Sequence, residues 1–440
     1  MTLPRRARVA RALYSTLLWL AQPLYLLRLA WRGRAEPAYC EAMGERLGFY
    51  RDAPSSGWLW VHAVSLGETR AAAALVAALR EARPGLRLLL THSTATGREA
   101  GRELLREADR QTWLPFDTPG AVRRFLAHFR PAVGVLMETE VWPNLLPAAK
   151  AGGVPLVLAN ARLSEKSRRK GERYAALLRP AVAALTRVLA QTEADAQRLR
   201  SAGAVDVRVC GNLKYDIAPD AALVARGQAW REAIARPVLL FAVSREGEEA
   251  SLLGAWSQRR GVQRERPLLV IVPRHPQRFD EVAALMRGSG LTLARRSEWG
   301  ERPAAAAFEA DAWLGDSMRE MPLYYGLGQV ALLGGSFAPL GGQNLIEAAA
   351  CGCPVVMGPH TFNFAEAAEL AAAAGAAQRV AGIEAGLDAA LALLADGRRL
   401  AEADERCRAF AAEHRGAAGR MAAEVITLWP EVQPRLQPHD

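Results

Sequence analysis

Two series of short apolar runs, each followed by turn residues and a helix-like stretch, constrain the fold of this chain most strongly. The first series lies between residues 58 and 210 and consists of WLWVHAV, LRLLLTHS, AVGVLMET, VPLVLANA, RVLAQT and VRVCG. The second begins near residue 237 and consists of PVLLFAVS, PLLVIVPRH, LTLARR, QVALLGGS and CPVVMGPH. Strands that alternate with helices along a chain form parallel sheets covered by helices on both faces. The pattern therefore predicts an α/β fold with two Rossmann-like domains facing a central cleft.

A polar segment between the two series predicts where one domain ends and the next begins. We expect an N-terminal anchor over residues 1–34, a first Rossmann-like domain over 35–212, a linker over 213–236 and a second such domain over 237–428. The 440 residues of the chain are sufficient for two domains. Near the C-terminus, the composition of residues 385–428 predicts continuous helix.

The N-terminus combines basic residues with an apolar run. Seven arginines precede the first acidic residue, Glu36, and supply most of the net charge of +10. The run ALYSTLLWLAQPLYLL, residues 12–27, is shorter than the ~20 residues of a membrane-spanning helix, and Pro23 would kink it. No small-residue cleavage site follows the run, so it does not resemble a secretory signal. We expect an uncleaved anchor held on an anionic membrane surface, with a buried N-terminal helix as the alternative.

Composition and charge argue against a nucleic-acid-binding protein and against a protein with disulfides or a cysteine metal site. Beyond the N-terminus, acidic and basic residues are mixed and no recognition motif occurs, so no nucleic-acid partner is expected. The five cysteines are odd in number and lack the paired spacing of metal ligands. We therefore expect reduced thiols in a cytosolic setting and no metal site, and we interpret the close pair Cys351 and Cys353 as packing residues.

Charged residues follow several predicted strands of the first series. Glu68 lies between the strand WLWVHAV and an alanine-rich helix, at the carboxyl end of the strand, where open α/β sheets bind ligands. Glu138 and Glu140 follow the strand AVGVLM in the same way. These two acids could act as acid or base groups, or they could be solvated carboxylates. Arg162 belongs to a basic loop, ARLSEKSRRK, which suits phosphate or carboxylate groups, with a solvated charged surface as the alternative.

Two strands of the second series end in sequences suited to phosphate binding. VIVPRHPQRF places Arg274 and His275 directly after a strand, where a guanidinium could hold a phosphate through two parallel hydrogen bonds. LLGGSFAPLGGQNLIEAAACG combines a glycine-rich loop with a helix that begins near Asn344, and the free N–H groups there could meet an anion. The alternatives are a surface arginine in the first case and a capping pair of Asn344 with Glu347 in the second. The loop matches neither G-x-G-x-x-G nor G-x-x-x-x-G-K-[ST], so dinucleotide binding and P-loop phosphoryl transfer are disfavoured.

Ten motifs taken together resemble a known family. In chain order they are HAVSLGE, THSTATG, PFDTPGAVRRFL, ETEVWPNLL, NARLS, GNLKYD, VPRHPQRF, GDSMRE, LLGGSFAPLGGQNLIE and GPHTFNF. They resemble the 3-deoxy-D-manno-octulosonic acid (Kdo) transferases of lipopolysaccharide assembly over about residues 37–370. The resemblance implies a GT-B glycosyltransferase fold with an N-terminal membrane-anchor helix, an N-terminal acceptor domain and a C-terminal donor domain.

The resemblance also implies substrates and a location. The donor would be CMP-Kdo, and the acceptor a lipid A precursor (lipid IVA) at the cytoplasmic face of the cell inner membrane, with its anionic lipid surface as a further partner. The reaction would be an inverting glycosyl transfer that needs no metal and no other cofactor. A sugar-nucleotide epimerase of GT-B fold and an inactive, membrane-tethered glycolipid-binding protein are the alternatives. The expected anchor argues against the first, and the retained motif residues argue against the second.

The family motifs imply roles for individual residues. Glu68 would be the general base, and the dipole of its helix favours the ionised form, so it should accept a proton at neutral pH. Glu138 and Glu140 would place the acceptor or support the base, and Arg162 and Lys214 would bind the acceptor or the sugar carboxylate. Glu347 would hold the ribose of CMP. The residues expected to bind the donor are Pro273, Arg274, His275, Gly315, Ser317, Met318, Gly335, Gly341, Gly342, Asn344 and Glu347.

The chain departs from the family pattern at three places near the expected donor phosphate. Gln343 replaces an expected histidine, Arg319 replaces an expected glycine, and Ser244 and Arg245 stand in place of a Ser-Thr-His form. Glutamine keeps hydrogen-bonding capacity but cannot become cationic. Arg319 could supply the positive charge that the missing histidine does not.

Overall fold

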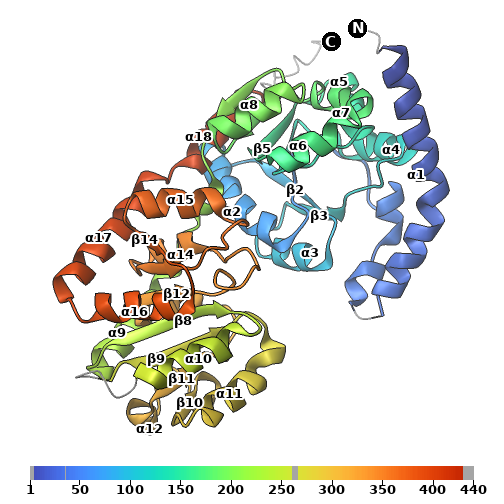
Figure 1. The fold of residues 1–440 in the computed structure, drawn as a ribbon. Helices are drawn as coiled ribbons and strands as arrows, with labels where there is room; N and C mark the ends of the chain where they lie inside the picture. The colour runs from blue at the N-terminus through green and yellow to red at the C-terminus, as the bar shows by residue number, and fades with distance from the viewer. Residues whose placement is uncertain (1–3, 35, 260–265, 430–440) are drawn as a thin grey trace. The chain divides into compact units, whose positions relative to one another are not determined.

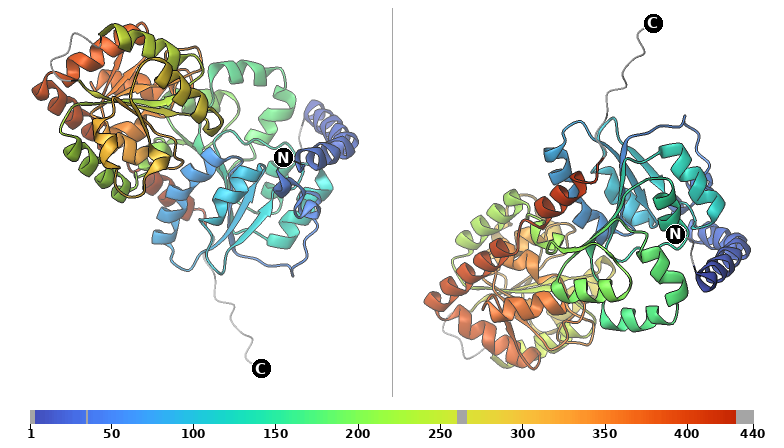
Figure 2. Two further views of the ribbon diagram at one scale, coloured as in Figure 1. Left: turned by 90° about the horizontal axis from the view of Figure 1, so that it is seen from below. Right: turned by 90° about the horizontal axis from the view of Figure 1, so that it is seen from above.

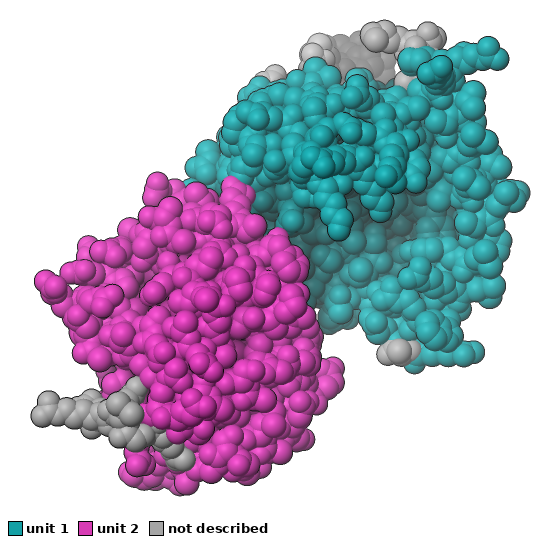
Figure 3. Space-filling model, viewed as in Figure 1, with its two compact units in different colours: residues 1–217, 415–440 teal, residues 218–414 magenta. Residues whose placement is uncertain are grey.

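The protein, described here by a computed structural model, consists of two compact units, which Figure 3 colours separately. The structure describes residues 4–34, 36–259 and 266–429. Unit 1 comprises the chain up to Ile217 and the segment from Arg415 onward, and unit 2 comprises Ala218–His414. Each unit is an α/β structure built on a parallel sheet, as the alternating pattern predicts.

The sheet of unit 1 contains seven parallel strands in the described residues, in the order β3-β2-β1-β4-β5-β6-β7. The strands are β1 Trp58–His62, β2 Arg87–His92, β3 Arg110–Trp113, β4 Val133–Met137, β5 Leu156–Ala161, β6 Arg187–Ala190 and β7 Val207–Val209. From β1 the strand order proceeds toward one edge, and from β4 it proceeds toward the other. The carboxyl ends of β1 and β4 therefore flank the topological switch point, where parallel sheets bind ligands.

Helices cover both faces of this sheet, as Figure 1 shows. The helices of this unit are α1 Arg5–Arg32, which lies at its margin, and α2 Leu66–Ala82, α3 Ala95–Arg102, α4 Pro119–Phe129, α5 Leu145–Ala151, α6 Glu165–Glu172, α7 Ala175–Val182, α8 Glu193–Ser201 and α18 Ala417–Ile426. Alternate residues of β1 point to opposite faces. Leu59 and Val61 pack with α2 and α18, whereas Trp60 packs edge-on against Phe125 of α4. A Cβ on Gly134 of β4 would overlap the Trp60 ring, so glycine makes room for tryptophan.

The C-terminal residues differ from the expected continuous helix over 385–428. Three helices occupy this region, namely α16 Ile383–Leu394, α17 Gly397–Glu413 and α18. The chain turns at Gly416, whose φ of +90° suits glycine, and α18 then buries Met421 and Val425 in the core of unit 1. Arg187 of β6 also bonds Glu424 at 2.6 Å. Contacts thus place α18 in unit 1, whereas the expected second domain extended to residue 428.

Helix α1 packs on unit 1 along one side only, and Figures 1 and 2 show it as the long dark-blue helix at the margin of this unit. Tyr14 donates a hydrogen bond to Asp117 at 3.1 Å, and the Tyr25 ring packs edge-on against Phe116. The opposite side exposes apolar side chains at steps of three or four residues: Val9, Leu13, Leu17, Leu20, Leu24, Leu27 and Trp31. No helix of the described residues has the length and the apolar composition that crossing a bilayer requires. Residues 1–3 of the expected anchor lie outside the described ranges.

The sheet of unit 2 also contains seven parallel strands in the described residues, in the order β10-β11-β9-β8-β12-β13-β14. The strands are β8 Val238–Ser244, β9 Leu268–Pro273, β10 Leu293–Arg295, β11 Ala312–Leu314, β12 Val330–Leu333, β13 Val355–Met357 and β14 Ala377–Arg379. Its further helices are α9 Ala221–Ile234, α10 Glu248–Arg259, α11 Phe279–Gly288, α12 Ala305–Glu309, α13 Met321–Leu327, α14 Leu345–Ala350 and α15 Ala365–Ala373. The switch point of this sheet lies between β8 and β12.

The segment 213–236, expected as a linker, is mostly part of unit 2. It contains a short 3₁₀ helix, Leu213–Asp216, and then α9, which packs closely on α13. A Cβ on Gly227 of α9 would overlap the Leu323 carbonyl oxygen, and one on Gly326 of α13 would overlap the Val224 carbonyl oxygen. These two glycines allow the helix backbones to approach, so α9 becomes a packed helix rather than a free connection.

Candidate functional site

Glu68 lies in the first turn of α2, directly after β1, at the switch point of unit 1. Its Oε2 accepts a hydrogen bond from the Val64 N–H at 2.7 Å. Ser65 caps the helix, because its hydroxyl accepts the Glu68 N–H at 3.4 Å and lies 3.4 Å from Glu68 Oε1. Ser65 thus caps the helix, and the Glu68 side chain reaches back to the residue before the cap, a variant of the capping box that fixes the direction of the carboxylate. No ion pair engages Glu68 among the described residues.

The protonation of Glu68 differs from the expectation based on the helix dipole. Burial, together with the nearby carboxylates of Glu138 and Glu140, raises the pKa of Glu68 from 4.5 to about 7. The hydrogen bond from Val64 acts in the opposite direction but does not compensate. Desolvation of the charged form outweighs the dipole here, so near neutral pH Glu68 is partly protonated rather than fully ionised. A carboxylate with a pKa near 7 is well matched to general base catalysis at that pH.

Glu138 and Glu140 lie in the loop after β4, on the other side of the switch point. Both side chains are half-buried, and because β1 and β4 are neighbouring parallel strands, the two acids and Glu68 form a carboxyl cluster at one edge of the sheet, where their charges also raise the pKa of Glu68. Glu138 has a φ of +59°, a left-handed conformation that costs energy for a residue with a side chain. Such strain is concentrated at functional sites, and here it occurs directly after β4, in the loop that holds two of the three carboxyl groups.

His62 is a member of this region that the sequence analysis missed. Its side chain is fully buried at the end of β1, and its Nε2 lies 3.7 Å from Glu140 Oε2 without forming a hydrogen bond. Its Nδ1 lies 2.9 Å from the Thr91 hydroxyl on β2. A histidine that ends a strand just before the SLGE motif was the available signal, but its neighbours become visible only in the folded sheet.

Arg162 and Lys214 lie in unit 1, at the ends of different elements. Arg162 follows β5, next to β4, and its half-buried side chain forms no ion pair among the described residues. Lys214 is part of the 3₁₀ helix after β7, and its N–H is accepted by Asn212 at 3.0 Å. The basic loop expected after Arg162 is instead helix α6, whose Arg168 and Arg169 pair with Glu165 on the exposed surface. Those charges form a solvated face, which was the alternative interpretation.

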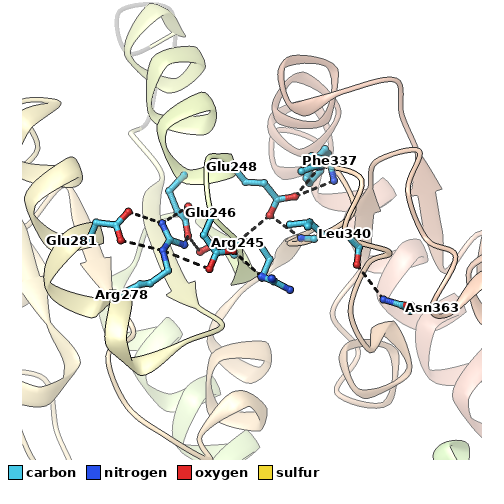
Figure 4. Close-up of polar contacts among 12 residues, drawn as sticks. Arg245, Glu246, Glu248, Arg278, Glu281, Phe337, Leu340 and Asn363 are labelled. Atoms are coloured by element: carbon cyan, nitrogen blue, oxygen red, sulfur yellow. Dashed lines mark hydrogen bonds and ion pairs between the residues drawn. The ribbon is translucent and has the colours of Figure 1, made fainter.

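In unit 2 a buried glutamate joins the two loops at the switch point, as Figure 4 shows. Glu248 opens α10 after β8, and its carboxylate accepts hydrogen bonds from backbone N–H groups of both loops. The four donors are Arg245 (3.0 Å), Gly335 (2.7 Å), Phe337 (3.1 Å) and Ala338 (3.1 Å). Burial raises the pKa of Glu248, although the four N–H donors oppose that effect. This residue holds the glycine-rich loop in shape, and the sequence analysis assigned it no role.

The glycine-rich loop after β12 has the conformation that its glycines suggest. Gly335, Gly341 and Gly342 all have positive φ, at +70°, +91° and +73°. The Gly342 N–H bonds back to the Gly335 carbonyl at 2.7 Å, which closes the loop. Asn363 from the GPHTFNF motif supports it by donating to the Leu340 carbonyl at 3.1 Å (Figure 4).

The helix expected after the loop is α14, with Asn344 as its N-cap accepting the Ile346 N–H at 3.2 Å. Glu347 lies half-buried in its first turn.

The two arginines of VPRHPQRF have different environments. Pro273 ends β9, and Arg274 and His275 follow it in the turn, where the Arg274 side chain is exposed and forms no ion pair among the described residues. Arg278 is buried and bonds Glu249 at 2.7 Å and Glu281 at 2.9 Å, part of the network in Figure 4. Arg274 therefore remains the candidate for a ligand, whereas Arg278 holds the β8 and β9 ends together.

The GDSMRE motif follows β11. Gly315 is buried, and a Cβ there would contact Tyr324 at 2.8 Å, so this glycine is required for packing. The Ser317 hydroxyl is hydrogen-bonded to Tyr324 Oη at 2.6 Å, whereas the Met318 side chain is 57% exposed. Arg319 has a φ of +65°, a conformation for which the glycine of the family pattern would be better suited.

The cysteines of this chain form no disulfides, and four of the five are buried. All five cysteines are free, and burial raises the pKa of Cys351 to about 12 and that of Cys353 well above its usual range. Both thiols lie in the core, which agrees with packing residues. Among the described residues no group of three or more His, Cys, Asp or Glu side chains could hold a metal ion.

Comparison with known proteins gives consistent matches. A family model described as 3-deoxy-D-manno-octulosonic-acid transferase (kdotransferase) matches residues 41–217. The chain is 51% identical over 383 residues to a 3-deoxy-D-manno-octulosonic acid transferase of Bordetella pertussis, covering 85% of this chain and 88% of that protein. It is 34% identical over 366 residues to the protein of the same name from Haemophilus influenzae, covering 81% and 84%.

Solved structures identify the fold. A glycosyltransferase from Rickettsia africae superimposes with a TM-score of 0.56 over 84% of this chain and 98% of that chain, at 10% identity. At that identity the match concerns the fold alone. With a parallel-sheet α/β structure in each unit, the fold is GT-B, as the motif resemblance implied.

Proposed function

The chain belongs to the 3-deoxy-D-manno-octulosonic acid (Kdo) transferase family, and from this premise we propose that it transfers Kdo from CMP-Kdo to a lipid A precursor, lipid IVA, in lipopolysaccharide biosynthesis. The observation that carries the proposal is the carboxyl cluster of Glu68, Glu138 and Glu140 at the switch point of unit 1. An acceptor hydroxyl is a weak nucleophile until its proton is removed. Glu68 has a fixed direction and a pKa near the working pH, which supports its role as the base.

The proposed reaction is an inverting displacement at the anomeric carbon of Kdo. The acceptor hydroxyl loses its proton to a carboxylate oxygen of Glu68 as its oxygen bonds to that carbon. The bond from the carbon to the CMP phosphate oxygen breaks at the same time, and CMP leaves with the electron pair. Glu138 and Glu140 would position the acceptor, and burial of Glu68, assisted by their negative charge, keeps its pKa high enough to hold the proton.

Unit 2 would bind the donor. The glycine-rich loop, with Gly335, Gly341 and Gly342, would admit the phosphate close to the backbone, and exposed Arg274 would neutralise its charge. The start of α14 at Asn344 would also face the phosphate, and Glu347 would hold the ribose of CMP. The remaining expected contacts are Pro273, His275, Gly315, Ser317 and Met318. In unit 1, Arg162 and Lys214 would bind acceptor phosphate or the sugar carboxylate. The proposal involves no metal ion and no other cofactor, which follows from the family resemblance.

We further propose that α1 is the anchor at the cytoplasmic face of the inner membrane. Its exposed apolar row, with basic residues at both ends of the helix, supports binding parallel to an anionic lipid surface. The acceptor is itself a membrane lipid, so an enzyme held at the surface would meet it there.

A direct assay tests the proposed function. Purified protein would be incubated with CMP-Kdo in the presence and absence of a tetra-acylated lipid A precursor in mixed micelles. We expect CMP release that depends on the lipid, and a product whose mass increases by one or more Kdo residues. Release without lipid would indicate hydrolysis or another sugar-nucleotide reaction, and binding without release would indicate an inactive glycolipid-binding protein; either result would reject the proposal.

A further inference from the structure

A cavity of about 210 Å³ lies between the inner side of α1 and the loop that follows β3 in unit 1. Tyr14, Leu18 and Tyr25 line it from the helix, and Phe116 and Asp117 line it from the loop. Two further lining residues, Arg46 and Trp142, come from other parts of the unit. None of the roles proposed for CMP-Kdo transfer uses this cavity.

Arg46 is the unusual residue of the cavity. It is 2% exposed, yet its Nε and Nη2 have no hydrogen-bond partner, and no carboxylate pairs with it among the described residues. Its guanidinium carbon lies 3.8 Å from the centre of the Trp113 ring, within the range of a cation–π contact, which does not satisfy the hydrogen-bonding capacity of Nε and Nη2. Burial lowers the pKa of Arg46 to about 10, still far enough above neutral that the group remains charged.

The acids near Arg46 are engaged elsewhere. Glu45 accepts the Trp113 N–H at 3.0 Å and pairs with Arg98 at 3.4 Å. Asp117 accepts hydrogen bonds from the Asn144 N–H at 2.9 Å, the Leu145 N–H at 2.8 Å and the Tyr14 hydroxyl at 3.1 Å. A buried charge without a partner is unfavourable, and proteins usually supply it with a counter-charge. The counter-charge for Arg46 is therefore expected from outside the chain.

A second unpaired hydrogen-bond donor and an apolar wall define the kind of ligand that this cavity could bind. The indole N–H of Trp142 is buried without a partner and belongs to the same lining. Two sets of unpaired N–H groups require a ligand rich in acceptor atoms. Leu18 and Ala21 of α1, with Leu114 and Phe116 of the loop, supply an apolar surface beside them.

We propose that this cavity binds an oxyanion, phosphate or carboxylate, carried on an apolar chain. The oxyanion would bond the N–H edge of Arg46 and the Trp142 indole, and the chain would lie along the inner side of α1. The site would thus take the end of an anionic lipid or a fatty acid. This inference does not depend on the proposed Kdo transfer, because it concerns binding alone.

Calorimetric titration of the full-length protein tests the proposal with four matched probes: decyl phosphate, decanoate, decanol and inorganic phosphate. We expect the two charged amphiphiles to bind at one saturable site, with decanol and inorganic phosphate each at least about tenfold weaker. The Arg46→Met variant should weaken both charged amphiphiles about tenfold or more and leave decanol unchanged. Its melting temperature without ligand should not fall, because the variant removes an unpaired buried charge.

Arg87→Met is the matched control, because the Arg87 guanidinium also lies over a tryptophan ring of unit 1, that of Trp58, but it pairs with no acid near Arg46 among the described residues and does not line the cavity. This variant should bind the charged amphiphiles as the wild type does. Equal binding of decanol and decyl phosphate, no effect of Arg46→Met, or no saturable site would overturn the proposal. Inorganic phosphate binding as tightly as decyl phosphate would overturn the part concerning the chain. If Arg46→Met does not fold, Trp142→Phe, which loses the N–H but keeps the ring, and the comparison of probes decide the question.

Discussion

The Glu68→Gln variant is expected to become more heat-stable than the wild type at alkaline pH while losing its activity. Burial and two neighbouring carboxylates raise the pKa of Glu68 from 4.5 to about 7. Between these values the folded state retains a proton that the unfolded state has released, so the stability of the wild type falls as pH rises through this window. At about 1.4 kcal/mol per pKa unit, the ionised carboxylate costs the folded protein about 3 kcal/mol above pH 7. Glutamine avoids this cost, and its amide oxygen can still accept the Val64 N–H.

The measurement is thermal unfolding of both proteins at pH 4, 7 and 9. For a unit of this size, about 3 kcal/mol corresponds to a rise in melting temperature of roughly 6–12 °C at pH 9, and to almost no difference at pH 4. Lipid-dependent CMP release should fall about 100- to 10,000-fold, the range for loss of a general base. In the wild type, kcat/KM should rise with pH and level off above about pH 7, as Glu68 becomes ionised.

The control is Glu193→Gln, which replaces an acid in the first turn of α8 that is 60% exposed. It should change the melting temperature little at any pH and leave activity unchanged. If Glu68→Gln melts below the wild type at pH 9, or if the difference between them is the same at pH 4 and 9, the burial argument is wrong. If the variant retains activity within tenfold, Glu68 is not the base.

Three further predictions concern unit 2. Arg274→Met should raise the KM for CMP-Kdo about tenfold without changing thermal stability, because the Arg274 side chain is exposed. Arg278→Met should destabilise the protein by about 3–5 kcal/mol in urea titration, because it leaves the buried carboxylate of Glu249 without its partner, and equal stability of the two variants would contradict this assignment. Gly227→Ala should lower the free energy of unfolding by about 3 kcal/mol, because the added Cβ overlaps the backbone of α13 where α9 packs on it. Gly254→Ala on α10, whose added Cβ would meet no atom within 4 Å, should be neutral or stabilising by less than about 1 kcal/mol, and similar effects of the two variants would refute the packing argument. Glu248→Gln should speed hydrogen exchange at the Gly335, Phe337 and Ala338 amides and weaken CMP binding about tenfold, because the single amide oxygen of glutamine cannot accept all the hydrogen bonds that two carboxylate oxygens accept. Unchanged exchange would show that the conformation of the glycine-rich loop does not depend on Glu248.

Local sequence predicted the fold class and most of the sheet. Long apolar runs such as WLWVHAV and PVLLFAVS became β1 and β8, because their β-branched and aromatic residues suit a strand buried on both faces. The strands β3, β11 and β14 were not predicted, because β3 (RQTW) and β14 (AQR) are mostly polar and β11 (AWL) is an apolar run of only three residues between Asp311 and Gly315. The positions of Glu68, Glu138 and Glu140 after their strands were also predictable, because the carboxyl ends of parallel strands share one edge.

The tertiary structure decided what these residues experience. The sequence of α18 predicts a helix, but only folding shows that Met421 and Val425 complete the core of unit 1 rather than that of unit 2. The helix dipole suggested an ionised Glu68, yet burial and two carboxylates from another strand raise its pKa to about 7. Propensity and turn chemistry depend on neighbours along the chain, so the sequence expresses them directly. Burial and charge interactions depend on residues brought together by folding, and the sequence alone does not say which ones meet.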